Sequence, residues 1–263
     1  MKKIEIKEFG GPEVLEIKNV DIGKPGQNEV LVKNLSIGIN YIDTYHRSGL
    51  YPIPLPSGIG LEACSIIEEV GSEVKLFKVG DRVTRASMPI GTYSEKQIIP
   101  EDKLVKVPDN ISDEVASCIT LKGITAEYLL HRTYKVKKGD KILYHAAAGA
   151  LGQIFCPWAN ALGAEIIGTV GSDEKIEIAK KNGCHHVINY NEKNFVEEVE
   201  KIVGKNGLDV VYDGVGAKTF EGSIEVLKVR GMMVAFGNAS GYVHTVDIKT
   251  VSYTHLTLPT NGC

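Results

Sequence analysis

The stretch that decides the fold is Asp140-Lys-Ile-Leu-Tyr-His-Ala-Ala-Ala-Gly-Ala-Leu-Gly152, in which an apolar strand runs into a glycine-containing turn and then a helix. Against the pattern G-x-G-x-x-G, its three key positions are Ala147, Gly149 and Gly152. The middle glycine lets the backbone approach a pyrophosphate, and the last lets the helix pack closely on the strand. The first amides of the helix can then bind phosphate. We predict a dinucleotide site that includes Ala148, Gly149, Ala150, Leu151 and Gly152.

Beyond this turn, short apolar strands alternate with helices. Helix 195–203 shows the pattern well, because its apolar residues recur with a period close to 3.6. Such alternation predicts an α/β fold with a parallel sheet covered on both faces, and right-handed crossovers make it a doubly wound, Rossmann-like domain. The expected strands are 140–145, 165–170, 186–189, 208–212 and 232–236, and the expected helices are 150–162, 173–182, 195–203 and 219–227.

The first part of the chain has a different pattern, with short strand-like runs separated by glycine and proline turns. One short helix fits residues 40–48. We expect a compact β-rich domain over residues 1–118 and the Rossmann domain over 119–250. The expected strands of the first domain include 29–33, 66–70, 81–84 and 104–107.

Composition excludes several classes of function. The formal net charge is −3 and the acidic and basic residues are interspersed, so there is no basic surface typical of nucleic-acid binding. No apolar run reaches the roughly 20 residues of a membrane-spanning helix, and the chain starts in a strand pattern without a signal segment. The five cysteines are scattered without a CxxC pair, which favours free thiols in a reducing compartment. We expect a cytoplasmic protein that binds neither nucleic acid nor membrane.

The end of the second Rossmann strand favours NADPH over NADH. An NAD site usually places an acidic residue there, about 20 residues after the turn, to accept the ribose hydroxyls. Here the strand ends in Gly171 and Ser172, and Lys175 follows shortly after. A 2′-phosphate would meet backbone donors, a hydroxyl and a cation. Asp173 argues against this interpretation because its carboxylate repels phosphate, and Lys175 alone is equally consistent with an ordinary solvated lysine.

Seven further stretches are specific in combination: Phe9-Gly-Gly-Pro-Glu-Val-Leu15, Ile37-Gly-Ile-Asn-Tyr-Ile-Asp-Thr-Tyr45, Ser48-Gly-Leu-Tyr51, Leu121-Lys-Gly-Ile-Thr125, His145-Ala-Ala-Ala-Gly149, Val187-Ile-Asn-Tyr190 and Phe236-Gly-Asn-Ala-Ser-Gly241. In these, the chain resembles the zeta-crystallin-like quinone oxidoreductases, a zinc-free branch of the medium-chain dehydrogenases/reductases. The resemblance extends to about residue 250. It implies a GroES-like catalytic domain before the Rossmann domain, an active site in the cleft between them, and a homodimer when the chain is full length.

The resemblance also implies roles for individual residues. Asn40, Tyr45 and Thr125 would line the nicotinamide end of the site, and Lys175 and Tyr190 would hold the 2′-phosphate of NADPH. The residues that would end the fifth strand beside the cofactor are Phe236, Gly237 and Asn238.

The zinc ligands of related families are missing. Zinc needs converging Cys, His or carboxylate ligands. Zinc-dependent relatives carry a Gly-His-Glu triplet where this chain has Gly60-Leu61-Glu62, and residues 40–43 lack the cysteine of those relatives. The four-cysteine structural lobe is absent as well. We therefore expect no metal, and we expect Glu62 to be a buried, hydrogen-bonded carboxylate rather than a catalytic residue.

Without a metal, the chain is poorly suited to polarise a simple alcohol or ketone. Quinones and conjugated carbonyls mainly need positioning and a donor beside the oxygen that becomes negative. We expect NADPH-dependent reduction of a quinone or enone, with Tyr45 or Tyr51 as hydrogen-bond donor or proton source and Asn40 as the orienting residue. Either tyrosine could instead line the cleft without taking part in the chemistry. Two alternatives stay open: an enoyl or enone reductase on the same scaffold, and a non-catalytic NADPH-binding protein of a crystallin or RNA-binding kind. The residues do not distinguish hydride from single-electron transfer.

The segment Val251-Ser-Tyr-Thr-His-Leu-Thr-Leu-Pro-Thr260 does not resemble the family. It reads like one translation frame of a transposon adapter used in sequencing libraries, so we interpret residues 251–263 as a non-native tail. The family would continue with a sixth strand and a return to the catalytic domain. Losing these would leave a strand edge and apolar surface uncovered, which predicts an unstable or aggregating 263-residue chain.

Pro157 lies inside the predicted helix that follows the glycine turn. An interior proline removes one hydrogen bond and costs roughly 3 kcal/mol. It either kinks the helix or stands, through a one-base sequence error, where the family usually has glutamine.

Overall fold

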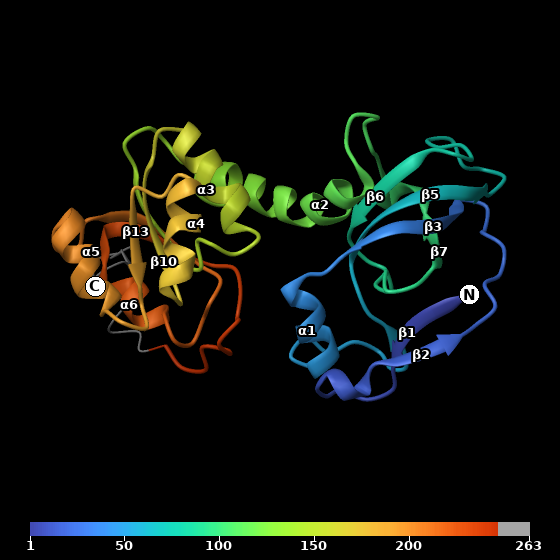
Figure 1. Ribbon diagram of the computed structural model, residues 1–263, viewed down its shortest axis with the longest axis horizontal. Helices are drawn as coiled ribbons and strands as arrows, with labels where there is room; N and C mark the ends of the chain where they lie inside the picture. Colours follow the sequence, from blue (N-terminus) through green and yellow to red (C-terminus); the bar gives the residue numbers. More distant parts are fainter. Residues whose placement is uncertain (247–263) are drawn as a thin grey trace, which may run out of the picture. The chain divides into compact units, whose positions relative to one another are not determined.

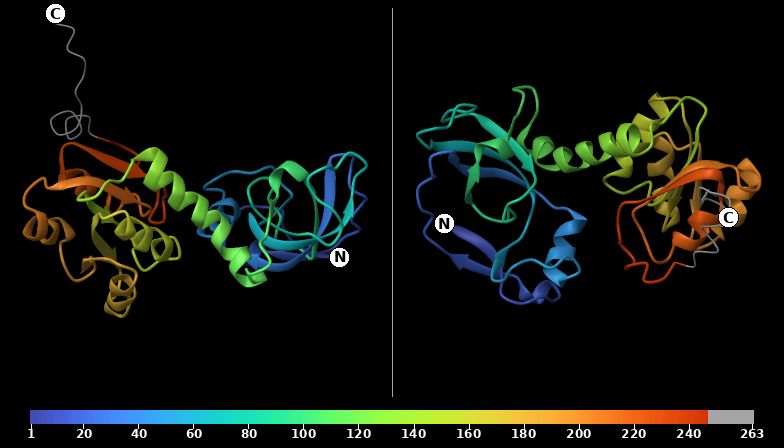
Figure 2. Two further views of the ribbon diagram at one scale, coloured as in Figure 1. Left: turned by 90° about the horizontal axis from the view of Figure 1, so that it is seen from above. Right: turned by 180° about the vertical axis from the view of Figure 1, so that it is seen from behind.

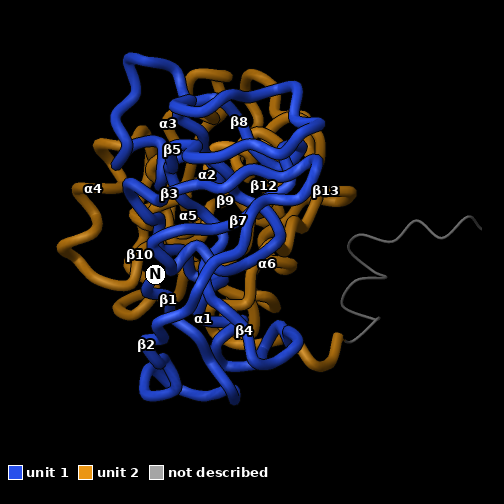
Figure 3. Tube along the Cα trace, turned by 90° about the vertical axis from the view of Figure 1, so that its right-hand side faces the viewer, with its two compact units in different colours: residues 1–121 blue, residues 122–263 orange. Residues whose placement is uncertain are grey.

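The computed structural model describes residues 1–246, which form two compact units divided between Leu121 and Lys122 (Figure 3). The predicted boundary at residue 118 falls inside helix α2 (Asp113–Tyr128), which the sequence pattern did not predict. The proposed non-native tail, 251–263, lies outside the described residues. Among residues 1–246, no helix has the length and apolar character needed to cross a bilayer.

The first unit, coloured blue to green in Figure 2, is rich in strands, as expected, and all its paired strands are antiparallel. Its larger sheet has the order β7-β3-β5-β6-β8, and a smaller sheet has the order β2-β1-β4. The predicted runs 29–33 and 66–70 cover only half of the longer strands Glu29–Gly38 and Glu62–Val70, because polar residues in the other halves, such as Ser36 and the buried Glu62 and Ser65, interrupt the apolar pattern. The strands are β1 (Lys2–Ile6), β2 (Glu16–Asn19), β3 (Glu29–Gly38), β4 (Ser57–Gly58), β5 (Glu62–Val70), β6 (Arg82–Ala86), β7 (Lys96–Pro100) and β8 (Val105–Lys106).

A helix closes one end of this unit, as the sequence predicted. Helix α1 (Tyr41–Ser48) begins after Asn40, whose extended backbone and amide hydrogen bond to Asp43 Oδ2 at 2.9 Å cap its first turn. It ends at Gly49, which adopts the left-handed conformation with φ 80°. Both ends of α1 are therefore fixed by local chemistry. This places Tyr45 inside the unit.

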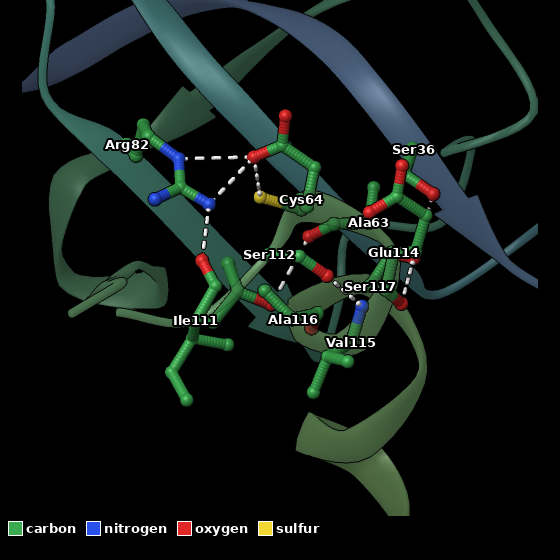
Figure 4. A network of polar contacts seen from close by, with 12 residues as sticks. Ser36, Ala63, Cys64, Arg82, Ile111, Ser112, Glu114, Val115, Ala116 and Ser117 are labelled. Carbon is green, nitrogen blue, oxygen red and sulfur yellow. Dashed lines mark hydrogen bonds and ion pairs between the residues drawn. The ribbon is translucent and has the colours of Figure 1, made fainter. Parts of the chain in front are cut away.

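The start of α2 is tied to the sheet of the first unit (Figure 4). The guanidinium of Arg82 on β6 donates to Asp113 Oδ1 at 2.7 and 2.9 Å and to the carbonyl of Ile111 at 2.6 Å. One turn further on, the hydroxyls of Ser117 and Ser36 are 2.8 Å apart. These contacts with β3 and β6 keep the first half of α2 in the first unit, three residues beyond the predicted boundary.

The second unit, in which Figure 1 labels α3 to α6, contains a five-stranded, all-parallel sheet in the order β11-β10-β9-β12-β13. This is the predicted doubly wound arrangement, in which the strand order reverses between β9 and β12. The elements are β9 (Lys141–Tyr144), α3 (Gly152–Ala161), β10 (Glu165–Val170), α4 (Ile176–Lys181), β11 (His186–Asn189), α5 (Phe195–Val203), β12 (Leu208–Asp213), α6 (Phe220–Glu225) and β13 (Leu227–Ala235), with short 3-10 or π turns at Pro12–Val14, Glu101–Lys103, Leu129–Thr133 and Asp173–Lys175.

Helices bury both faces of this sheet, which explains the continuous apolar strands. Ile142 and Phe155 belong to a core shared with α3 and α4. Leu143, the next residue along β9, belongs to the opposite core with Val199 of α5. Successive side chains of a strand point to opposite faces, so both must be apolar.

Two segments differ from the prediction. The expected helix 173–182 is a 3-10 turn followed by α4, and β13 starts at Leu227, five residues before the predicted strand. The early part of β13 contains Arg230 at φ 66° and a register shift against β12, an irregularity that the apolar pattern does not reveal. Pro157 lies inside α3, and the helix continues on both sides of it.

Candidate functional site

All the turns that follow the parallel strands lie at one edge of the sheet, because the strands run in the same direction. The reversal between β9 and β12 opens the position where α/β sheets bind ligands. Every predicted cofactor residue after residue 145 lies in or near one of these turns, so the structure brings this group to one edge of the second unit. The turns begin at His145, Gly171, Tyr190, Gly214 and Phe236.

The glycine turn has the form that a diphosphate requires. Ala146 has φ 58°, and the amide of Gly149 donates to the Ala146 carbonyl at 2.8 Å. A Cβ on Gly152 would lie 2.3 Å from the Ala147 carbonyl oxygen, so only glycine lets α3 start this close to β9. Among residues 1–246, no acceptor is paired with the amides of Ala150, Leu151 and Gly152. These donors therefore fit a bound anion.

The ends of β10 and β11 form the second part of this edge. A Cβ on Gly171 would lie 3.0 Å from the Tyr190 hydroxyl, so these two predicted residues are neighbours. The Lys175 amide donates to the Ser172 carbonyl at 3.2 Å, and the exposed Lys175 side chain has no ion-pair partner among residues 1–246.

The carboxylate of Asp173 is engaged by a neighbouring amide. Asn189 Nδ2 donates to Asp173 Oδ1 at 2.8 Å, which turns this oxygen toward the end of β11. The acidic residue that argued against a phosphate here is therefore partly satisfied by the protein itself.

The ends of β12 and β13 form the third part. The Phe236 amide donates to the Asp213 carbonyl at 2.9 Å, and the Phe236 ring packs 6.1 Å from that of Tyr144. A Cβ on Gly237 would lie 2.6 Å from the Gly214 carbonyl oxygen, so the two loops touch backbone to backbone. Asn238 follows directly, in the same loop.

In the first unit, Asn40 is held by a fully buried acid. Its Nδ2 donates to Glu62 Oε2 at 2.8 Å, and Glu62 Oε1 accepts from the Leu121 amide at 2.7 Å. The expectation of a buried, hydrogen-bonded Glu62 is confirmed. Glu62 thus fixes the orientation of the Asn40 side chain.

The two predicted catalytic tyrosines lie together, and Tyr45 belongs to α1, the helix that Asn40 caps. The ring centroids of Tyr45 and Tyr51 are 5.0 Å apart, and the Tyr51 amide donates to the Tyr45 carbonyl at 3.1 Å. Tyr45 is buried and Tyr51 is half-buried. Thr125, the remaining predicted residue, is half-buried on α2 in the second unit.

The sequence analysis did not identify Asp43 and Tyr93, which interact with each other near the start of α1. The Tyr93 hydroxyl donates to Asp43 Oδ2 at 2.8 Å, so the acid that caps α1 also anchors a tyrosine from a distant segment. Burial, together with the charge of Asp43, raises the pKa of Tyr93 well above its usual value. A tyrosine in this state is a hydrogen-bond donor that stays protonated.

Comparison with known proteins agrees with this architecture. Residues 26–109 match the alcohol dehydrogenase GroES-like domain, and residues 150–260 match the family described as zinc-binding dehydrogenase. A quinone oxidoreductase of Pseudomonas aeruginosa is 47% identical over 99% of this chain and 82% of its own. The chain belongs to the quinone oxidoreductase family.

Two further relatives of this chain have names that describe their chemistry. The crystal structure of Escherichia coli quinone oxidoreductase complexed with NADPH aligns with a TM-score of 0.94 and 48% identity, over 97% of this chain and 78% of that one. A 2-haloacrylate reductase from a Burkholderia species is 46% identical over 92% of this chain and 75% of its own.

One of the two matching families is described as zinc-binding, yet the described residues of this chain contain no set of side chains that could bind zinc. Within residues 1–246, no three His, Cys, Asp or Glu side chains gather in a way that could hold a metal ion. Leu61 is buried and offers no ligand atom. Its neighbour Glu62 uses both oxygens for hydrogen bonds to protein groups.

The sequence analysis also missed a buried network of polar residues beneath this edge of the sheet. It joins Thr169, His145, Ser223, Asp213 and Thr219, all of which are buried. The available signal was Asp213-Gly-Val-Gly216, an acid and two glycines directly after an apolar strand. Its partners lie on β10, directly after β9 and at α6, so the sequence offered no spacing that connects them.

Proposed function

We propose that this chain catalyses the NADPH-dependent reduction of quinones without a metal ion. The observation that carries the proposal is a set of donors that have no partner among residues 1–246: the amides of Ala150, Leu151 and Gly152 and, on the same sheet edge, the cation of Lys175. The amides suit a diphosphate, and the lysine suits a further phosphate on the adenosine ribose. The NADPH complex of the Escherichia coli relative supports this assignment.

In this proposal the second unit binds the cofactor. NADPH, when bound, supplies the reducing equivalents. The glycine turn would hold the diphosphate through Ala148, Gly149 and the amides of Ala150, Leu151 and Gly152. The 2′-phosphate would be held by Gly171, Ser172, Lys175 and Tyr190. The residues that would contact the nicotinamide end are Thr125, Phe236, Gly237 and Asn238.

The first unit would act on the substrate. The hydroxyl of Tyr45 or Tyr51 donates a hydrogen bond, or a proton, to the substrate oxygen that becomes negative. Asn40 orients the reacting group, and its own amide is kept in place by Glu62. A quinone needs little further activation, because its acceptor orbitals are already low in energy. Positioning and hydrogen bonding are then enough, and no Lewis acid is required.

A conjugated carbonyl is the second candidate substrate. The 2-haloacrylate reductase relative favours it, because its name describes reduction of a conjugated alkene. The same tyrosine hydroxyls would serve an enone or acrylate oxygen. Both substrate classes therefore belong in the test.

The deciding experiment follows NADPH loss by the purified chain with para-benzoquinone, a haloacrylate and a simple ketone. We expect oxidation with the quinone or the acrylate, none with the ketone, and no effect of a chelator. NADH should be a poorer donor. Protein that binds NADPH yet oxidises it with no quinone or conjugated carbonyl would refute the catalytic proposal, and inhibition by the chelator would refute the metal-free mechanism.

A further inference from the structure

His145 directly follows β9 and Asp213 ends β12, the two strands on either side of the reversal, so the two residues are neighbours across the sheet. Tyr144 of β9 pairs with Tyr212 of β12, and the His145 amide donates to the Tyr212 carbonyl at 3.1 Å. His145 and Asp213 are each only 1% exposed. Such deeply buried polar groups are costly unless every one is hydrogen-bonded.

Asp213 satisfies this demand with four hydrogen bonds. Oδ1 accepts from the amides of Val215 and Gly216 at 2.8 and 2.9 Å. Oδ2 accepts from the hydroxyls of Thr219 and Ser223 at 2.7 and 3.0 Å. One carboxylate therefore shapes the whole turn between β12 and α6.

The remaining hydrogen bonds connect this carboxylate to the glycine turn. Ser223 gives its single hydrogen to Asp213, so it accepts from His145 Nε2, 2.9 Å away. His145 Nδ1 is then the acceptor for the Thr169 hydroxyl, also at 2.9 Å. Burial lowers the pKa of His145 to about 4, which agrees with this neutral form. All the donors point toward Asp213, which strengthens each bond in turn.

Two members of this chain of hydrogen bonds, His145 and Asp213, each adjoin a loop at the sheet edge. His145 directly precedes Ala146, whose positive φ starts the glycine turn. The turn organised by Asp213 carries the loop after β13, because the Val215 carbonyl accepts from the Ser240 amide at 2.7 Å and the Gly214 carbonyl accepts from the Ala239 amide at 3.3 Å. The glycine turn after β9 and the turn after β12 flank the position where the strand order reverses.

We propose that Asp213, together with Ser223 and His145, is the positioning group of the dinucleotide site. It would hold the glycine turn and the loops after β12 and β13 in the geometry that NADPH binding needs, without touching the cofactor. This inference rests on the proposed NADPH site and adds residues that act through it.

The chain contains a matched control for this role. Asp209 lies on the same strand, and its Oδ2 accepts from the Lys141 amide at 2.7 Å. It therefore joins β12 to β9 at the amino ends of the strands, at the opposite edge of the sheet. If Asp213 contributed only to the structure, substitution of either acid would change the NADPH dissociation constant to a similar extent. If Asp213 positions the site, only its substitution weakens NADPH binding.

The experiment measures NADPH dissociation constants of the complete chain and of Asp213→Asn and Asp209→Asn. The Asp213→Asn amide places an NH₂ group against donors, so we expect the dissociation constant to rise about tenfold or more, as loss of a buried acceptor predicts. Asp209→Asn should bind NADPH as the wild type does. Equal binding by wild type and folded Asp213→Asn would overturn the inference. If the wild type itself binds no NADPH, the proposed function fails first.

A second pair decides the question if Asp213→Asn does not fold. Thr219→Val removes one hydroxyl donor to Asp213 while preserving the side-chain shape, and Thr219→Ser restores that hydroxyl. We expect Thr219→Val to raise the KM for NADPH severalfold with a smaller change in kcat, and Thr219→Ser to return it to the wild-type value. Wild-type KM in Thr219→Val, or no rescue by Thr219→Ser, would contradict the positioning role.

Discussion

Asn40 and Glu62 are joined by a 2.8 Å hydrogen bond from the amide of Asn40 to a carboxylate with no exposed surface. The same carboxylate accepts from the Leu121 amide, so it links the start of α1, strand β5 and helix α2. A leucine occupies the neighbouring position 61, where zinc-dependent relatives carry a histidine. In this chain the acid of the triplet orients the Asn40 amide, and both of its oxygens accept hydrogen bonds from protein groups.

The first prediction concerns this acid. Glu62→Gln replaces an acceptor with a donor that faces either the Asn40 amide or the Leu121 backbone, so the free energy of unfolding should fall by about 1–3 kcal/mol. Urea unfolding measures this. Glu68→Gln on the same strand breaks a half-exposed ion pair with Lys96 and should cost less than about 1 kcal/mol. An equal effect of the two changes would argue against a structural role for Glu62.

The second prediction concerns cofactor choice. Lys175→Ala removes the cation expected at the 2′-phosphate, so NADPH should bind about tenfold more weakly while NADH binding stays unchanged. Titration of both cofactors provides the measurement. Lys180→Ala is the control, because Lys180 on the neighbouring α4 pairs with Glu177 at 2.9 Å. Parallel loss of NADH affinity in Lys175→Ala would show that the lysine does not read the extra phosphate.

The third prediction concerns pH. The pKa of His145 falls from 6.5 to about 4 because burial disfavours the charged ring, an effect that the charge of Asp213 only partly opposes. The unfolded chain therefore takes up a proton near pH 6.5, whereas the folded chain resists it. Stability from this group is complete above pH 6.5 and is lost as the pH falls toward 4, by about 3 kcal/mol in total.

Unfolding of wild type and His145→Gln across this pH range tests the point. Burial also lowers the pKa of His46, so both proteins should lose some stability in acid. The loss should be smaller in His145→Gln, because one titrating group is gone. Identical pH slopes for the two proteins would be incompatible with a neutral, buried His145.

The fourth prediction concerns Pro157. Pro157→Ala restores an amide that can donate to the Gln153 carbonyl inside α3, so stability should increase by up to about 3 kcal/mol. A thermal melt records the change. Pro54→Ala, in an exposed loop, should give no such gain. A destabilised Pro157→Ala would mean that the proline makes compensating contacts.

The sequence by itself determined the Rossmann half almost completely. Its strands carry apolar residues on both faces, and its turns carry glycines, so period and turn chemistry identify most of its elements locally, apart from the 3-10 turn before α4 and the early part of β13. The predicted helix 195–203 is exactly α5, and the site residues of the glycine turn follow from the spacing of Gly149 and Gly152. Local rules suffice there because the ligand is expected to meet backbone amides rather than distant side chains.

Only the tertiary structure decided where the first unit ends and what supports the site. Helix α2 contains Gly123 and several β-branched residues, which weaken its local signal, and it is fixed by Arg82 from a strand about 30 residues earlier. Asp213 and His145 likewise gain their meaning from partners on other elements. Hydrogen bonds between segments far apart in the chain leave no periodicity in the sequence, so they become visible only when the sheet brings those segments together.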